Sequence, residues 1–122
     1  MRKQTSTNFH NQKILEMSCG LSYAVVLITG RWKVNILWYI TKGFNRYGQL
    51  KRNIEGISEK MLTQRLKDLE KDGLLTRRDF GTVPPHVEYH LTETSQALIP
   101  VLEGLCEWGN KAKKIRDTEK TA

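Results

Sequence analysis

The segment at positions 47–75 constrains the fold of this 122-residue chain more than any other part of it. Leu50 and Ile54 lie four positions apart in an otherwise polar stretch, the spacing that puts two side chains on one face of a helix. After a short break the same periodicity returns in a second apolar stripe, formed by Leu62, Leu66 and Leu69. The sequence therefore predicts two short amphipathic helices, each with one face to bury.

The residues between and after these helices indicate tight turns. Gly56 can take the positive φ that other residues resist, and Ser58 is a good N-cap for the second helix. Glu59 places a negative charge in the first turn, where the helix dipole favours it, and Gly73 ends the helix. Two helices joined in this way form a helix-turn-helix, whose second helix enters the major groove of DNA.

The face of the second predicted helix that lies opposite its leucines is polar and basic. Side chains of this kind hydrogen-bond to phosphates and base edges. The DNA-reading set that we expect on this helix comprises Ser58, Lys60, Met61, Thr63, Gln64, Arg65 and Lys67. A helical hairpin with an ordinary solvated face is the alternative, because many surface helices carry such a pattern.

The formal net charge of +7 is unevenly distributed along the chain. Positions 31–78 hold twelve Lys and Arg against five Asp and Glu, whereas positions 79–110 hold five Asp and Glu and no Lys or Arg. The positive charge therefore lies on the helix-turn-helix and its flanks. This favours a localised anion-binding face, whose natural partner is nucleic acid or an anionic membrane surface.

Length and composition narrow the classes of protein further. A chain of 122 residues corresponds to one domain and leaves little room for a separate catalytic domain. Its apolar runs are far shorter than the roughly 18–20 residues of a membrane span, and its polar start lacks the apolar segment of a signal peptide. Two cysteines do not make a disulfide framework. We therefore expect a cytoplasmic protein that does not enter a membrane.

The residues before the helix-turn-helix predict a polar, mobile arm over residues 1–18 and then two helices. The first, over 21–28, is short and apolar, so we expect it to be buried. The second, over 31–40, is apolar on most sides and is therefore expected to be buried on most sides.

The residues after the helix-turn-helix predict a strand over 75–80, a turn-rich loop, and a second strand over 87–91. A β-hairpin directly after a DNA-reading helix makes a winged helix-turn-helix, a mainly α fold with a small β-hairpin wing. We expect the wing to contact DNA through Arg77, Arg78 and His86.

His86, Glu88 and His90 share one face of the second strand and have side chains that bind metals. Alternation alone explains this polar face, and no fourth ligand stands nearby in the sequence, so we expect no metal. The sequence also lacks a glycine-rich phosphate loop, a nucleophile elbow and zinc-spaced cysteines. We therefore expect neither an enzyme nor a cofactor.

A last helix is predicted over 94–110, capped by Thr92. Pro100 lies inside it, so we expect a kink or a helix start close to the proline. Its wide apolar stripe has nothing to pack against on a complete winged-helix core, which predicts a homodimer through this helix. The expected interface residues are Leu98, Leu102, Leu105 and Trp108. Residues 111–122 are expected to form a frayed, charged tail.

Several short motifs follow one another along the chain. The first motif is Gly30-Arg31-Trp32-Lys33 with Ile36-Leu37, and the second is Arg46-Tyr47-Gly48-Gln49-Leu50. The third has three parts, Gly56-Ile57-Ser58, Leu62-Thr63-Gln64-Arg65-Leu66 and Gly73-Leu74. The fourth is Pro84-Pro85-His86-Val87-Glu88-Tyr89-His90-Leu91-Thr92, and Trp108 follows it. Over residues 19–109 their order resembles the HxlR-type transcriptional regulators, relatives of the MarR group. The chain departs from that pattern at Gly20, Tyr47 and Ser95, where proline, phenylalanine and glycine are usual.

The resemblance implies a winged-helix domain over 19–110 that binds a roughly palindromic operator in double-stranded DNA as a homodimer, usually as a repressor. It also implies an N-terminal cysteine that senses electrophiles or oxidants, and Cys19 stands at that place. A small-molecule inducer is a further possible partner. A helix start favours a reactive thiolate, whereas a buried, inert Cys19 is the alternative. We expect Cys106 to fill the core or the interface.

Two other functions remain open. An RNA- or ribosome-associated winged helix would bind single-stranded RNA in preference to duplex DNA, but such modules use an aromatic-rich platform that this chain lacks. A protein-interaction module without operator specificity would ignore DNA even at low salt.

Overall fold

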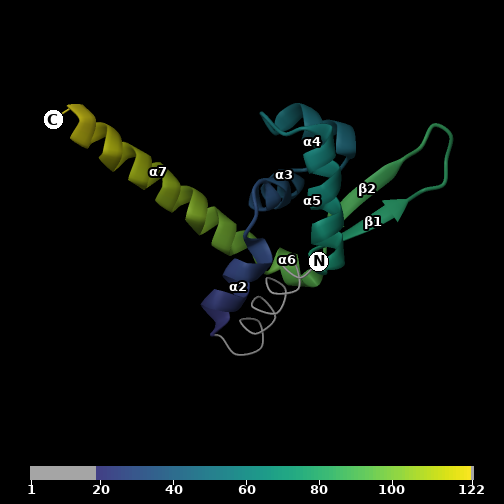
Figure 1. Cartoon of the computed structure of the whole chain (residues 1–122), viewed down its shortest axis with the longest axis horizontal. Helices are drawn as coiled ribbons and strands as arrows, with labels where there is room; N and C mark the ends of the chain where they lie inside the picture. The colour runs from purple at the N-terminus through teal and green to yellow at the C-terminus, as the bar shows by residue number, and fades with distance from the viewer. Residues whose placement is uncertain (1–18, 122) are drawn as a thin grey trace, which may run out of the picture.

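The computed structural model describes residues 19–121, so the expected arm over residues 1–18 lies outside the described part of the chain. The elements follow in the order α2 (Gly20–Ile28), α3 (Lys33–Thr41), α4 (Tyr47–Asn53), α5 (Glu59–Lys71), β1 (Leu75–Asp79), β2 (Val87–Leu91), α6 (Glu93–Gln96) and α7 (Ile99–Thr121). Figure 1 shows α3, α4 and α5 gathered at the centre, with the β-hairpin and α7 extending from opposite sides. The predicted winged-helix architecture is confirmed.

The hydrophobic core forms around α3, which contacts α4, α5, α7 and β2. Ile36 and Leu37 of α3 are almost completely buried. The other buried apolar residues of the core are Ile40, Leu50, Ile54, Ile57, Leu62, Leu66, Leu69, Leu74, Leu75 and Leu102. The helix predicted over 31–40 is confirmed, but it begins at Lys33 because Trp32 takes a left-handed φ of 81° that α-helices do not contain.

The two predicted helices of the helix-turn-helix and their turn are confirmed as α4 and α5. Gly56 has a φ of 90° in the turn, and Gly73 has a φ of 77° beyond the end of α5. The Ser58 hydroxyl accepts a hydrogen bond from the Met61 N–H at 3.1 Å, which satisfies one of the free donors of the helix start. Each helix buries the leucine or isoleucine face that its periodicity predicts.

β1 and β2 pair antiparallel and form the predicted wing. Leu75 pairs with Leu91 at the base of the hairpin, and β1 ends one residue earlier than the sequence predicts. The Tyr89 N–H donates to the Asn45 carbonyl at 2.8 Å, which ties β2 to the loop before α4. Tyr89 and Leu91 pack against the core, so the base of the wing is held by the same core as α5.

Two hydroxyl groups join α6 to the end of α5. Thr92 Oγ1 donates to the Gly73 carbonyl at 2.7 Å, and Ser95 Oγ donates to the Leu74 carbonyl at 2.7 Å. The two side chains also form a capping box at α6, so Thr92 is a helix cap as predicted. The single helix expected over 94–110 is divided into α6 and α7, however, and Thr92 caps only α6. Ser95 is buried but hydrogen-bonded, which explains how a hydroxyl is tolerated at this departure from the family pattern.

α7 begins at Ile99, with Pro100 in its first turn. The predicted start near the proline is therefore confirmed, because the first turn of a helix needs no N–H from its residues. The helix continues to Thr121, so the expectation of a frayed tail is wrong for residues 111–121. This segment is rich in Lys, Arg and Glu, which favour helix. Neither α7 nor another helix within residues 19–121 is long and apolar enough to cross a membrane.

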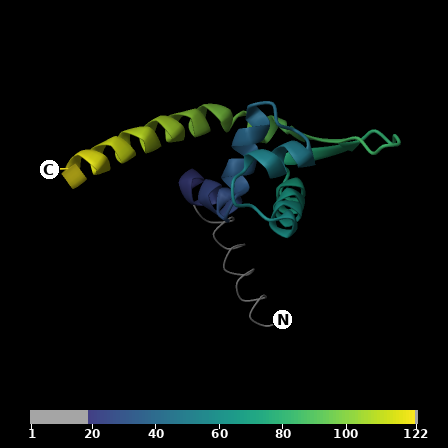
Figure 2. The same cartoon turned by 90° about the horizontal axis from the view of Figure 1, so that it is seen from above.

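α2 has the predicted position, but the expectation that it is buried is wrong for the single chain. None of its residues is buried, and Leu21, Tyr23 and Val25 are exposed. Figure 2 shows α2 and α7 on the side of the body away from the hairpin. The apolar composition of a helix predicts that burying its surface is favourable, but it does not identify the surface that covers it.

The predicted dimer stripe of the last helix divides into two parts. Leu102 is only 4% exposed and belongs to the core, and Leu98 packs against the core. The expectation that Leu102 faces a partner is wrong, because the first turns of α7 pass over α3. Leu98 is half-buried, so its contact with a partner stays a prediction. Leu105 and Trp108 are 50% and 66% exposed and remain free for a partner.

Leu102→Ala should lower the free energy of unfolding by about 2–5 kcal/mol, because it leaves a cavity beside α3. Denaturant titration at one fixed protein concentration measures the change. The control Val83→Ala, at a side chain that is 97% exposed, should change the stability by less than about 0.5 kcal/mol. Equal unfolding midpoints for the two variants would show that Leu102 does not stabilise the core.

Candidate nucleic-acid interface

The outward face of α5 carries most of the predicted DNA-reading set. Its exposed members are Ser58, Lys60, Thr63, Gln64 and Lys67. The Ser58 hydroxyl is already engaged as the N-cap. Met61, which the set also contains, is half-buried and packs against the core, so the structure does not place it on the reading face.

Arg65, expected at the margin of the reading face, is bound within the protein. Its Nε donates to the Arg31 carbonyl at 3.1 Å, and its Nη1 donates to Asp68 Oδ2 at 2.8 Å. The first bond joins α5 to the turn before α3. Arg65 therefore positions α5 relative to this turn, and sequence periodicity alone does not reveal this long-range contact.

Asp68 accepts hydrogen bonds from two neighbours on α5. Gln64 Nε2 donates to its Oδ1 at 3.0 Å, and Arg65 donates to its other oxygen. Partial burial opposes ionisation of Asp68, but the two hydrogen bonds and the positive charges of Lys33 and Arg65 outweigh it. The pKa of this carboxyl group therefore lies below its ordinary value, and Asp68 is a carboxylate at neutral pH.

Tyr47 holds the start of α5 in place. Its hydroxyl donates to the Glu59 carbonyl at 3.1 Å and lies 3.3 Å from Thr63 Oγ1. The phenylalanine that is usual at this position has no hydroxyl for these contacts. The sequence did not predict a site role for Tyr47, although its departure from the family pattern was the signal that marked it.

The wing presents its two predicted arginines on opposite faces. Arg77 pairs across the hairpin with Tyr89, and Arg78 pairs with Glu88, so adjacent arginines project in opposite directions. Both are exposed. The Arg78 guanidinium lies 4.6 Å from the centre of the Phe80 ring, which supports it at the outer part of the wing.

Glu88 bridges the two histidines of β2. His86 Nε2 and His90 Nε2 each lie 2.8 Å from one of its carboxylate oxygens. The hydrogen bonds from His86 and then His90 lower the pKa of Glu88 below its ordinary value. Within the described residues, no group of three His, Cys, Asp or Glu side chains has an arrangement that could hold a metal ion. The His86 ring also contacts the Phe80 ring in a tilted arrangement, with ring centres 4.5 Å apart.

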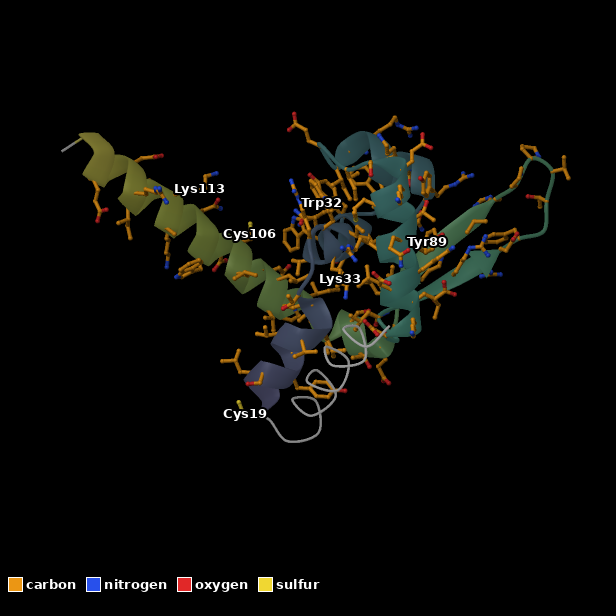
Figure 3. The ribbon with its side chains drawn as sticks, viewed as in Figure 1. Cys19, Trp32, Lys33, Tyr89, Cys106 and Lys113 are labelled. Carbon is orange, nitrogen blue, oxygen red and sulfur yellow. The ribbon has the colours of Figure 1, made fainter. Side chains whose placement is uncertain are left out.

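Cys19 is the N-cap residue of α2 and is exposed, so its predicted place before the first helix is confirmed. The backbone groups of Ser22 and Leu21, together with the Ser22 hydroxyl, lower the pKa of the Cys19 thiol below its ordinary value. Cys106 is also exposed in the single chain, so it does not fill the core, and its other expected place, the interface, stays a prediction. Figure 3 shows Cys19 at the N-terminal end of α2 and Cys106 on α7.

The part of α7 beyond the core carries an exposed apolar stripe. Its members Val101, Leu105, Trp108 and Ile115 recur at helical spacing and are each at least half exposed. Leu21, Tyr23 and Val25 of α2 add exposed apolar surface at the start of the described chain. We call these seven side chains the terminal apolar surface.

Comparison with known proteins agrees with this architecture. Residues 27–117 match the family of HxlR-like helix-turn-helix proteins. MalR of Fusobacterium mortiferum, assigned as a regulatory protein, is 43% identical over 94 residues, covering 76% of this chain and 89% of MalR.

Solved structures of the redox regulator HypR are similar in fold. The reduced form has a TM-score of 0.75 at 31% identity, covering 82% of this chain and 99% of HypR. The oxidized form has a TM-score of 0.70 at 34% identity, covering 76% and 96%. The family match spans the helix-turn-helix, the wing and most of α7, and the chain therefore belongs to the HxlR-like helix-turn-helix family of transcriptional regulators.

Proposed function

We propose that this regulator binds a roughly palindromic operator in double-stranded DNA as a homodimer and represses transcription there. The exposed polar face of α5 is the observation that carries this proposal. Lys60, Thr63, Gln64 and Lys67 project from it, while the leucines on the other side are buried. In a winged helix this face enters the major groove, and the wing contacts the backbone or the minor groove.

Selection from randomised duplex DNA tests the function. The wild type should enrich a two-fold symmetric sequence whose half-sites lie about one helical turn, roughly 34 Å, apart. Gln64→Ala should relax the preference at one base pair in each half-site, because glutamine pairs bidentately with adenine at about 1–3 kcal/mol per pair. An absence of any enriched sequence would contradict operator binding.

The same experiment separates the two other functions. Tighter binding to single-stranded RNA than to the selected duplex would identify an RNA-associated winged helix. No binding to any nucleic acid at low salt would identify a protein-interaction module. The net positive charge of positions 31–78 favours a nucleic acid over a protein as the partner. The exposed face of α5 has no aromatic side chain on which bases could stack, which favours duplex DNA over single-stranded RNA.

Arg78→Ala should weaken binding to all DNA sequences by a similar factor, because an interaction between the wing and phosphate carries no base preference. The slope of log affinity against log salt concentration should fall by about 0.9 for each phosphate that the variant no longer neutralises. Arg116→Ala, which removes the same charge from α7 on the other side of the molecule, is the control and should leave the slope unchanged. A loss of affinity confined to one operator position would contradict the backbone role.

The terminal apolar surface supports the proposed homodimer. Its side chains lie outside the core of the single chain, and a second copy would cover them. The proposed interface therefore includes Leu105 and Trp108 and continues along α7 to Ile115, beyond the range 94–110 that the sequence indicated.

Leu105→Asp should give a folded monomer, because Leu105 is 50% exposed and its loss leaves the core intact. Analytical ultracentrifugation at micromolar concentration should show half the wild-type mass, and operator affinity should fall because both half-sites must be met together. Val83→Asp on the wing should keep the wild-type mass. A wild type that sediments as a monomer would rule out this interface.

Cys19 is proposed to sense electrophiles or oxidants. Its exposure and lowered thiol pKa support this role, as does the likeness to a redox regulator. Near neutral pH a thiol with a lowered pKa has a larger thiolate fraction, and the thiolate is the nucleophile.

Two single-cysteine variants test the reactivity of Cys19. Cys106→Ser, which keeps Cys19, should react with iodoacetamide at pH 7 several-fold faster than Cys19→Ser, which keeps Cys106. Treating Cys106→Ser with a quinone should then change its operator affinity by about 3 kcal/mol, or roughly a hundredfold. Unchanged affinity, with Cys19 shown by mass spectrometry to be modified, would refute the switch.

A further inference from the structure

Asp68 is an acidic residue beside a surface that is proposed to face DNA. Its side chain is 28% exposed, and its negative charge opposes the approach of phosphates. An acidic side chain that made no other interaction here would only repel phosphates and weaken DNA binding. The two hydrogen bonds that Asp68 accepts indicate that it holds the side chains of its neighbours in place.

The carboxylate determines which way the Gln64 amide points. A carboxylate only accepts hydrogen bonds, so the Gln64 group that faces Asp68 Oδ1 at 3.0 Å must be the amide nitrogen. If the amide turned over, two acceptor oxygens would meet. The carbonyl oxygen and the second N–H of Gln64 are left without this partner, and together they form the acceptor and donor pair that adenine requires in the major groove.

The carboxylate is itself held from outside α5. Asp68 Oδ2 accepts from Arg65 at 2.8 Å, and Arg65 also donates to the Arg31 carbonyl at 3.1 Å in the turn before α3. A chain of hydrogen bonds therefore runs from that turn through Arg65 and Asp68 to Gln64. A side chain ordered before binding loses less conformational freedom when it binds.

We propose that Asp68 is a positioning residue for sequence reading, which holds the Gln64 amide in the one orientation that presents an adenine-reading edge. This inference rests on the proposed operator binding. It assigns Asp68 and Arg65 to the support of the reading side chain, with no DNA contact of their own.

Base preference at the pair read by Gln64 tests the proposal, measured as the ratio of affinities for the selected operator and for operators with that pair replaced. The wild type should prefer adenine by about tenfold or more. Asp68→Asn keeps the shape of the side chain, but its amide presents either an acceptor or a donor to Gln64, so the Gln64 amide can take both orientations. The affinity ratio should therefore fall to within about twofold of the ratio for Gln64→Ala. Adding Asp68→Asn to Gln64→Ala should change the ratio no further.

Glu70→Gln is the matched control, because it removes the same charge from α5 at an exposed residue that makes no ion pair within the described residues. It should keep the wild-type ratio even if overall affinity rises. A wild-type ratio in Asp68→Asn would overturn the proposal while leaving operator binding intact. A change of preference by Asp68→Asn that persists in the Gln64→Ala background would also overturn it, since Asp68 would then read a base itself.

Side-chain amide NMR of the free wild type gives a second test that does not require the variant to fold. The Gln64 amide should be as rigid as the backbone of α5 in relaxation measurements. Gln96, whose exposed side chain makes no hydrogen bond within the described residues, should be mobile. Equal mobility of the two amides would show that Asp68 does not hold Gln64.

Discussion

The burial of one face of α5 against the core is the constraint on which the rest of the structure depends. Leu62, Leu66 and Leu69 are almost completely buried, and each contributes roughly 1.5–3 kcal/mol through removal from water. Because a helix is rigid, burying these leucines also determines which side chains point outward. The polar face with Gln64 is therefore oriented by apolar contacts that lie on the other side of the same helix.

Hydrogen bonds at both ends of α5 also hold the helix in position, in addition to the burial of its apolar face. The Tyr47 hydroxyl contacts the first turn through the Glu59 carbonyl, and the Thr92 hydroxyl contacts the Gly73 carbonyl beyond the last turn. Arg65 adds a bond from the middle of the helix to the turn before α3. The proposed reading of DNA by the polar face of α5 requires this precision, because base edges are distinguished by hydrogen bonds whose strength depends strongly on angle and distance.

The terminal apolar surface differs from the core in its exposure to solvent. Core leucines are covered within one chain, whereas Trp108 and Leu21 are more than half exposed. The core of the described residues does not cover these side chains, so the proposed homodimer would use a different set of residues from the one that stabilises the fold. Cys19 is exposed at the start of α2, next to this surface in the sequence and outside the buried core that holds α5.

The sequence by itself determined the helix-turn-helix, its N-cap Ser58, the glycine turn at Gly73 after α5, and the hairpin that follows, because local periodicity, caps and turns act over a few residues. Only the tertiary structure decided that Leu102 belongs to the core and that Arg65 binds the Arg31 carbonyl. It also decided that Met61 packs inward, that α2 has no fully buried residue within the described chain, and that α7 runs to Thr121. Periodicity indicates that a face is buried, but the covering partner can lie far along the chain or in another molecule, and only the packed structure identifies it.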